Sequence, residues 1–153
     1  MHRFILTFSI GLSASIGYAA DFGTTGLIDI PTARMMDDGE FKVAISRQKV
    51  ADIYSLNYQL TPWLESTFRY TIFNPDKVVG SPNDLYDRSY EVKLRLIRER
   101  RLFPQIAVGI KDVLGTGAWG SEYLVASKSM GDFDFTLGMG WGRLAERDVF
   151  SNP

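Results

Sequence analysis

Tyr54-Ser-Leu-Asn-Tyr-Gln-Leu-Thr61 is the stretch that decides the fold, because large apolar side chains alternate in it with polar ones. Successive side chains of a β-strand point to opposite sides, so alternation at every second residue is typical of a strand with two different faces. Pro62 follows directly and favours a turn. The stretch therefore predicts a strand with one apolar and one polar face.

Six further segments alternate in the same way, and residues that favour turns lie between them. In one of them, the pattern places Tyr123 and Val125 on the apolar face and Glu122 on the polar face. The other five begin near Phe41, Leu64, Tyr90, Ile106 and Phe133. Together the segments predict an all-β fold, an antiparallel meander of about seven amphipathic strands over residues 41–153.

Residues 1–19 have the organisation of a secretory signal peptide. Arg3 supplies the positive start, residues 4–16 are apolar apart from small Ser, Thr and Gly, and small residues precede a cleavage site after Ala19. The apolar run is too short for a transmembrane helix, and no cysteine follows it as in a lipoprotein signal. We expect an exported chain in which residues 20–40 form a separate segment, either a plug or the lead-in to the first strand.

The composition excludes several classes of protein. Lys and Arg total 17 against 18 Asp and Glu, a balance that gives no field for attracting nucleic acid. Cysteine is absent, and the single histidine, His2, lies in the predicted signal peptide. A Ser-His-Asp triad, a Cys-His pair and the usual zinc sites are therefore excluded from the mature chain, although carboxylate chemistry and calcium held by oxygen ligands stay open. We expect no enzymatic activity, no cofactor and no metal.

Two features favour a membrane barrel over a soluble β-sandwich, whose strands also alternate. Opposite charges share the polar face in mid-strand, as Glu65 and Arg69 do, and such residues suit a wet lumen. Connections at one end are short, whereas residues 74–88 and 114–120 are longer, an asymmetry typical of outer-membrane barrels. The long connection 98–104 fits this rule poorly. The expected structure is a partial barrel in the outer membrane, and the alternative is a soluble periplasmic β-sandwich that binds an anionic polysaccharide.

The polar faces carry charged residues that are expected to line the lumen. These are Glu65, Arg69, Glu91, Lys93, Arg95, Lys111, Glu122, Lys128 and Asp134. Two interpretations stay open: the charges offer a polar path to a polymer, or they only neutralise one another inside a small barrel. Paired acids could also hydrolyse a glycan, but alternation fixes no separation between them, so no catalytic residue is assigned.

Three short motifs have simple structural explanations. Gly115-Thr-Gly-Ala-Trp-Gly120 matches a dinucleotide-binding pattern, but a strand rather than a helix is predicted after it, which indicates a hairpin loop. Asp37-Asp-Gly-Glu40 lacks the spacing of a calcium-binding loop and is typical of a turn into a strand. The basic residues within 95–101 either meet anionic head groups or an acidic glycan, or lie in a solvated turn.

Six stretches carry a likeness to known proteins over nearly all of the mature chain. They are Gly26-Leu-Ile-Asp-Ile-Pro-Thr-Ala-Arg-Met-Met-Asp-Asp-Gly39, Tyr58-Gln-Leu-Thr-Pro-Trp63, Phe68-Arg-Tyr70, Gly115-Thr-Gly117, Ser121-Glu-Tyr-Leu-Val-Ala-Ser-Lys128 and Gly131-Asp-Phe-Asp-Phe-Thr-Leu-Gly-Met-Gly-Trp-Gly142. They resemble the YjbH-like family of exopolysaccharide biosynthesis proteins.

The resemblance implies an outer-membrane β-barrel that supports the export or modification of an exopolysaccharide. Its implied partners are outer-membrane lipid, the polysaccharide, and periplasmic and lipoprotein components of secretion; it implies no catalytic residues. Members of the family are several times longer than this chain. Seven strands would also leave two edges open in lipid, where unpaired backbone groups are costly. We therefore expect the N-terminal piece of a longer protein, from a truncated or split reading frame.

Overall fold

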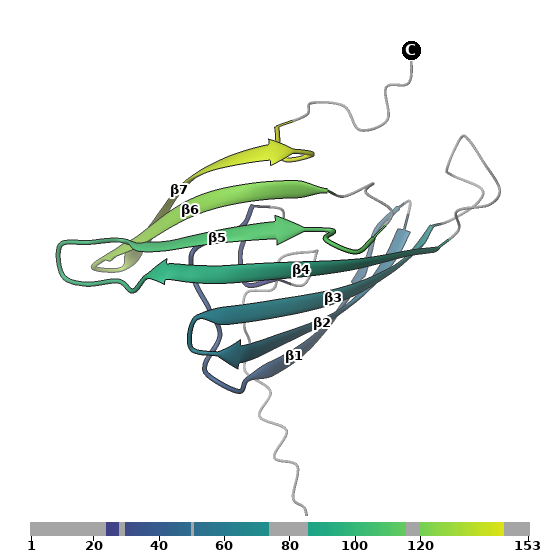
Figure 1. Cartoon of the computed structure of the whole chain (residues 1–153), viewed down its shortest axis with the longest axis horizontal. Coiled ribbons are helices and arrows are strands. Elements are labelled where there is room, and N and C mark those ends of the chain that lie inside the picture. Colours follow the sequence, from purple (N-terminus) through teal and green to yellow (C-terminus); the bar gives the residue numbers. More distant parts are fainter. Residues whose placement is uncertain (1–23, 28–29, 50, 74–85, 116–119, 146–153) are drawn as a thin grey trace, which may run out of the picture.

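The computed structural model describes residues 24–27, 30–49, 51–73, 86–115 and 120–145. The predicted signal peptide lies outside these ranges. Seven strands make up the described structure, and no helix occurs within the described ranges (Figure 1). The strands are β1 (Phe41–Arg47), β2 (Ala51–Thr61), β3 (Leu64–Phe73), β4 (Tyr86–Ile97), β5 (Gln105–Lys111), β6 (Ser121–Met130) and β7 (Phe133–Gly142).

Each strand pairs in antiparallel fashion with the next one along the chain, so the sheet order is β1-β2-β3-β4-β5-β6-β7. The predicted all-β meander of seven strands is therefore confirmed. Within the described residues, β1 pairs only with β2 and β7 only with β6. The sheet consequently has two edges, at β1 and at β7.

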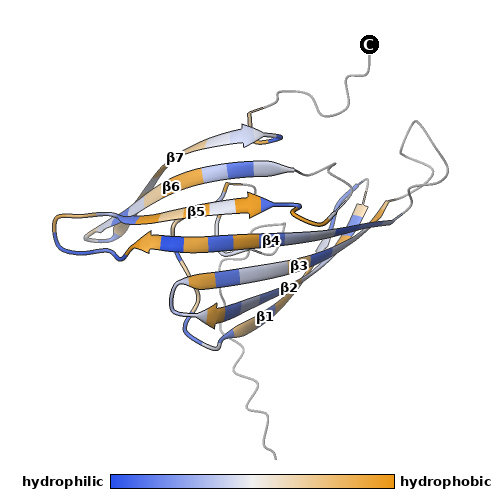
Figure 2. Ribbon diagram, viewed as in Figure 1, coloured by the Kyte–Doolittle hydropathy of each residue, from blue (hydrophilic) through white to orange (hydrophobic). Residues whose placement is uncertain are grey.

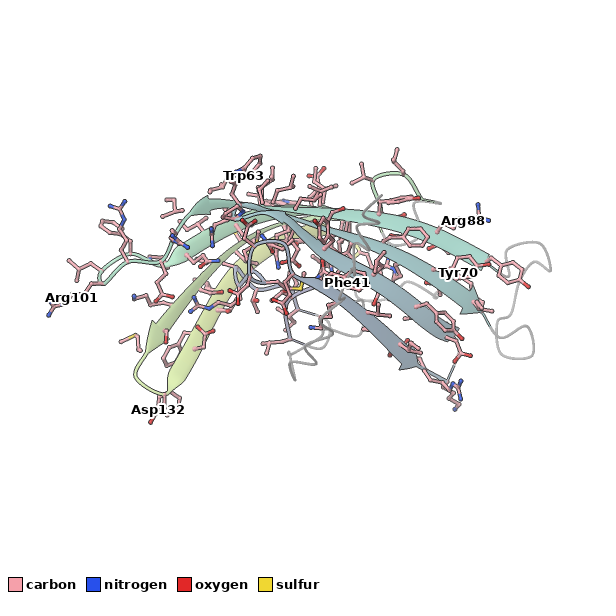
Figure 3. The ribbon with its side chains drawn as sticks, turned by 90° about the horizontal axis from the view of Figure 1, so that it is seen from below. Phe41, Trp63, Tyr70, Arg88, Arg101 and Asp132 are labelled. Carbon is pink, nitrogen blue, oxygen red and sulfur yellow. The ribbon has the colours of Figure 1, made fainter. Side chains whose placement is uncertain are left out.

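The sheet is strongly curled and forms an arch with a concave and a convex face (Figure 3). Twisted strands curl a sheet, and bulges increase the bend locally. The register shifts between Gln59 and Thr61 in β2 and between Arg95 and Ile97 in β4. Both shifts lie near the same end of the strands, where the connections Pro62–Trp63 and Gly131–Asp132 are also found. This is called the short-turn end.

Buried and exposed residues alternate along most strands, but it is the polar residues that are buried. Figure 2 shows hydrophilic and hydrophobic residues alternating along the strands. Apolar side chains of the convex face are exposed, such as Ile45 at 67% and Leu137 at 81%. On the concave face, Glu65 and Lys93 are fully buried. The apolar core is correspondingly small, and its larger cluster consists of Ala33, Ala107, Tyr123 and Val125.

β6 presents its faces the other way round from the prediction. Tyr123 lies opposite Gly109 of β5 on the concave face, and its ring occupies the space where a side chain at Gly109 would be. The Tyr123 hydroxyl donates a 2.9 Å hydrogen bond to Glu91. Glu122 is therefore on the convex face, exposed and opposite Trp141. The prediction that Glu122 points inward was wrong, because a tyrosine with a partner for its hydroxyl can be buried among polar residues.

Candidate functional site

Residues 24–27 and 30–37, here together named the covering segment, lie under the arch against the concave face (Figure 3). The segment exchanges hydrogen bonds with side chains of five strands, from β3 to β7. Those side chains are Glu65, Lys93, Gln105, Ser127 and Asp134. Residues far apart in the sequence therefore converge on one short piece of chain.

Lys93 and Glu65 form the centre of this contact. They are register partners on β4 and β3, and 3.3 Å separates Lys93 Nζ from Glu65 Oε2. Lys93 Nζ also donates to the carbonyl oxygens of Thr25 at 2.9 Å and Arg34 at 2.8 Å. A buried charge is tolerated where it is paired and hydrogen-bonded, and this ammonium has both kinds of partner. Lys93 thus joins two distant points of the covering segment to the sheet.

The Glu65 carboxylate is fixed from two further directions. Its Oε1 accepts hydrogen bonds of 3.0 Å from the backbone N–H of Thr25 and from the Asn57 side chain. Thr67 in turn donates a 3.0 Å hydrogen bond to Asn57 Oδ1, which sets the orientation of the amide. The neighbouring strands β2 and β4 therefore hold the carboxylate as well as the covering segment does.

Ala33 is the most deeply packed residue of the covering segment and is fully buried. Its N–H donates to Ser127 Oγ at 2.9 Å, and its carbonyl accepts from Gln105 Nε2. Ala107, also fully buried, belongs to the same small apolar cluster. Both backbone groups of Ala33 are thus satisfied by side chains, as a buried non-sheet segment requires.

A group of charged residues, here named the rim cluster, fastens the covering segment at the short-turn end. Arg34 contacts Glu99 at 2.5 Å and Asp134 at 2.5 and 2.8 Å, and Lys128 contacts Glu99 at 2.8 Å. Hydrogen bonds from Lys128, Arg34 and the Ser129 backbone lower the pKa of Glu99 to about 2. Hydrogen bonding to Asp134, and secondarily to Glu99, raises the pKa of Arg34 against the opposing effect of burial. Both charges are therefore present at neutral pH.

A second polar group lies toward the other end of the concave face. Besides the bond between Tyr123 and Glu91, Arg69 donates a 2.8 Å hydrogen bond to Ser89. Lys111 Nζ lies 6.0 Å from the centre of the Tyr123 ring, within the range of a cation–π contact. All these side chains are buried. Polar residues therefore fill the concave face along its length.

A cavity of about 570 Å³ lies between the covering segment and the two edge strands, beside the contact of Arg34 with Asp134. Met35, Met36 and Arg34 line it from the segment, Lys42 lines it from β1, and Thr136 lines it from β7. The segment then turns into β1: Glu40 N–H donates to Asp37 O at 2.9 Å, and Gly39 has a φ of +76°. Only glycine adopts that conformation at no steric cost, which fits the predicted turn.

The residues that the sequence placed in the lumen are found in three situations. Glu65, Arg69, Glu91, Lys93 and Lys111 are buried on the concave face. Arg95 and Asp134 lie on the same face but are less buried, because they are near the short-turn end. Lys128 has the alternation of the convex face, opposite Phe135, and reaches Glu99 from the strand end. A lumen-lining role remains a prediction for the other residues, and Glu122 no longer belongs to that set.

Sequence reasoning missed Arg34, Asn57, Glu99, Tyr123 and Ser127 as parts of this site. The one available signal was the absence of alternation in 26–39, which marked a segment of a different kind. Within the described ranges, no cluster of acids and histidines suits a metal ion. The same part of the chain holds no helix long and apolar enough to cross a membrane.

Comparison with known proteins gives one consistent result. No solved structure matches the chain. The chain is 42% identical over 139 residues to a protein of Escherichia coli (strain K12) named "Uncharacterized lipoprotein YjbH", a match that covers 88% of this chain and 20% of that protein. The chain thus spans about a fifth of the length of this relative. Residues 19–153 also match the family model described as exopolysaccharide biosynthesis protein. The chain therefore belongs to the YjbH family of exopolysaccharide biosynthesis proteins.

Proposed function

We propose that the chain forms part of an outer-membrane β-barrel that supports exopolysaccharide secretion without catalysing a reaction. One observation carries the proposal: apolar side chains cover the exposed convex face, whereas the ion pair of Lys93 and Glu65 is fully buried. A large exposed apolar surface is unusual for a protein in water. It is the expected outer surface of a barrel in a bilayer, whose strands carry polar residues inward.

Closure of the barrel needs partners for β1 and β7. Unpaired strand edges do not face lipid, because their N–H and C=O groups would lose all hydrogen bonds. In this proposal, further strands beyond the seven described ones supply the partners. The curl of the sheet supports such closure, since it already turns the two edge strands toward the same side (Figure 3).

The covering segment acts in this proposal as a plug inside the barrel. It is bound to five strands, so it occupies the short-turn half of the concave face. A filled lumen favours a role in holding or guiding a polymer and its partner proteins over a role as a wide pore. The proposed partners are outer-membrane lipid, the exopolysaccharide, and periplasmic and lipoprotein components of secretion. The relative's name, a lipoprotein, supports an exported, membrane-associated location.

Arg95 offers a test of whether the lumen contacts the polymer. It lies on the concave face, half-buried, and among the described residues no hydrogen bond or ion pair engages its side chain. Arg95→Gln is expected to reduce polymer export while leaving insertion intact, because the Arg95 side chain makes no hydrogen bond or ion pair within the described structure. Lys93→Met is the matched comparison, since loss of its contacts should impair assembly itself. Unchanged export by inserted Arg95→Gln protein would favour a purely structural role for the lumen charges.

Location is tested by membrane fractionation of the full-length protein with a heat-modifiability gel. A β-barrel is expected in the outer-membrane fraction, with a band that shifts on heating as the barrel unfolds. Recovery as a soluble periplasmic monomer would overturn the proposal and favour the β-sandwich that binds an anionic polysaccharide. An enzymatic role would instead be favoured if replacing Glu65 or Glu91 abolished turnover of a glycan in fully folded protein.

A further inference from the structure

The connection between β4 and β5, residues 98–104, combines arginines with exposed apolar side chains and is here named the basic loop. Arg98, Arg100 and Arg101 are exposed and directly precede Leu102 and Phe103. Leu102 is 83% exposed and Phe103 63% exposed. A 3.0 Å hydrogen bond from Arg100 N–H to Phe103 O closes the tip of the loop into a turn. The loop therefore presents charged and apolar groups together, in a fixed local conformation.

The charges of the basic loop are not neutralised within the described structure. Among the described residues, no ion pair joins Arg98, Arg100 or Arg101 to an acid. Glu99 lies between them, but it is bound to Arg34 and Lys128. Three positive charges consequently remain for an external anion.

A bulge in β4 extends the apolar convex face toward the basic loop. The register shifts between Arg95 and Ile97, and both Leu96 and Ile97 are exposed. Bulges set two residues against one and re-aim their side chains. Figure 3 shows the loop, marked by Arg101, extending beyond the end of the arch. Convex face and loop thus form one continuous apolar surface with arginines at its end.

We propose that the basic loop binds the phosphate groups of anionic glycerophospholipids, with Leu102 and Phe103 inserted among the lipid chains. The inference rests on the proposed membrane function and adds a ligand to it. Arginine suits phosphate because its planar guanidinium donates two parallel hydrogen bonds. The loop projects from the short-turn end, the periplasmic side of outer-membrane barrels, where the leaflet consists of glycerophospholipid. Apolar and aromatic side chains at the level of the head groups are typical of membrane interfaces.

The test places an environment-sensitive dye on the loop of the full-length protein, reconstituted into vesicles. This chain holds no cysteine, so Leu102→Cys gives one labelling site within it, and Leu114→Cys gives a matched exposed site in another connection; any cysteine elsewhere in the full-length protein is first replaced by serine. Vesicles consist of phosphatidylcholine alone or with phosphatidylglycerol. Phosphatidylglycerol should reduce acrylamide quenching of the dye at position 102 several-fold and leave position 114 unchanged.

Charge variants decide whether the arginines cause this protection. Replacement of Arg98, Arg100 and Arg101 by Gln should abolish the effect of phosphatidylglycerol, since each basic residue near an anionic surface contributes about fivefold to binding. The control replaces Arg47, Lys49 and Arg88 by Gln, three exposed cations away from the loop, and should retain the effect.

Each other outcome contradicts the inference in a distinguishable way. Equal protection in both vesicles, or equal loss in both charge variants, would show that the loop does not select anionic lipid through its arginines. A water-exposed dye in protein with a heat-modifiable band would overturn the loop inference while the barrel proposal stands. A soluble protein with no heat-modifiable band would overturn both.

Discussion

The convex and concave faces of the sheet are built from opposite kinds of residue, and burial on each is the reverse of the usual order. Ile45 and Leu137 lie exposed on one face, while Glu65 and Lys93 are fully buried on the other. In water, apolar residues are normally buried and unpaired charges are not. The concave face is matched to its own covering segment, and in the proposed barrel the convex face is matched to the apolar interior of a membrane.

The largest expected effect comes from removing a buried charge on the concave face. Lys93→Met leaves the buried Glu65 carboxylate without its cation and two carbonyls of the covering segment without their donor. Removal of one partner from a buried ion pair costs about 3–5 kcal/mol. The free energy of unfolding, measured by urea titration of the reconstituted full-length protein, should fall by that amount.

A second substitution serves as the control for Lys93→Met. Adding Glu65→Gln removes the uncompensated charge, so the double variant should regain part of the lost stability. The carbonyls of Thr25 and Arg34 stay without the ammonium, which limits the recovery. Wild-type stability of Lys93→Met alone would mean that water reaches this site and that the concave face is not sealed.

The next effect tests the convex side. Leu56 lies exposed in the middle of β2, so in the proposed barrel Leu56→Arg would place a charge in the lipid and cost about 2–4 kcal/mol. Leu114→Arg, in a connection between strands, is the matched control and should cost less than about 1 kcal/mol. Urea titration in vesicles measures both. Near-identical stability of the two variants would argue that water rather than lipid surrounds the convex face.

A smaller effect sharpens the comparison at β6, whose faces are reversed from the simple pattern. A Cβ at Gly109 would lie 2.2 Å from Cζ of the Tyr123 ring, so Gly109→Ala must displace the ring and weaken its hydrogen bond to Glu91. Overpacking of this kind costs about 1–3 kcal/mol. The double variant Gly109→Ala with Tyr123→Phe should cost less than the sum of the two single changes. Additive costs would show that the ring and the glycine are independent.

The sequence predicts the strands well and the site only in part. In β2 the alternation of Tyr54 to Thr61 reports the local geometry directly, because each side chain's face depends on its own position. Tyr123 does not follow the same rule, since its ring is apolar and its hydroxyl polar. Its face is decided by Gly109 of β5, which leaves room for the ring, and Glu91 of β4, which accepts the hydrogen bond of the hydroxyl. Whether a residue with a polar tip is buried therefore depends on its neighbours in the folded sheet and not on the local sequence pattern.

The contacts of the covering segment are even harder to predict from the sequence than the face of Tyr123. Ala33 and Ser127 are 94 positions apart, and Arg34 and Asp134 are 100 apart. No local pattern encodes such a pair, because it depends on the curl of the whole sheet. What the sequence does indicate is that 26–39 lacks alternation and that acids and bases share one face.

The smallest expected effect concerns the link between the covering segment and the sheet. The pKa of Glu99 lies at about 2 in the folded protein, below the value of about 4.3 for an unfolded chain. A lowered carboxyl pKa stabilises the fold above the unfolded value, and this contribution disappears as the pH falls through the folded value. The rim cluster should therefore hold the covering segment undiminished from neutral pH to about pH 4.3 and release it progressively toward about pH 2.

Hydrogen exchange of residues 32–37 measures this release when each pH is compared with Glu99→Gln, so that intrinsic exchange rates cancel. Protection relative to the variant should be constant near neutrality and vanish in strong acid, because Glu99 then becomes neutral like glutamine. Glu122→Gln, a change on the convex face, should leave residues 32–37 unaffected at every pH. If the difference between wild type and Glu99→Gln disappeared already near pH 6, Glu99 would not be held by Arg34 and Lys128. The covering segment would then depend on its contacts at Thr25 and Ala33, on Lys93, and on the ion pair of Arg34 with Asp134.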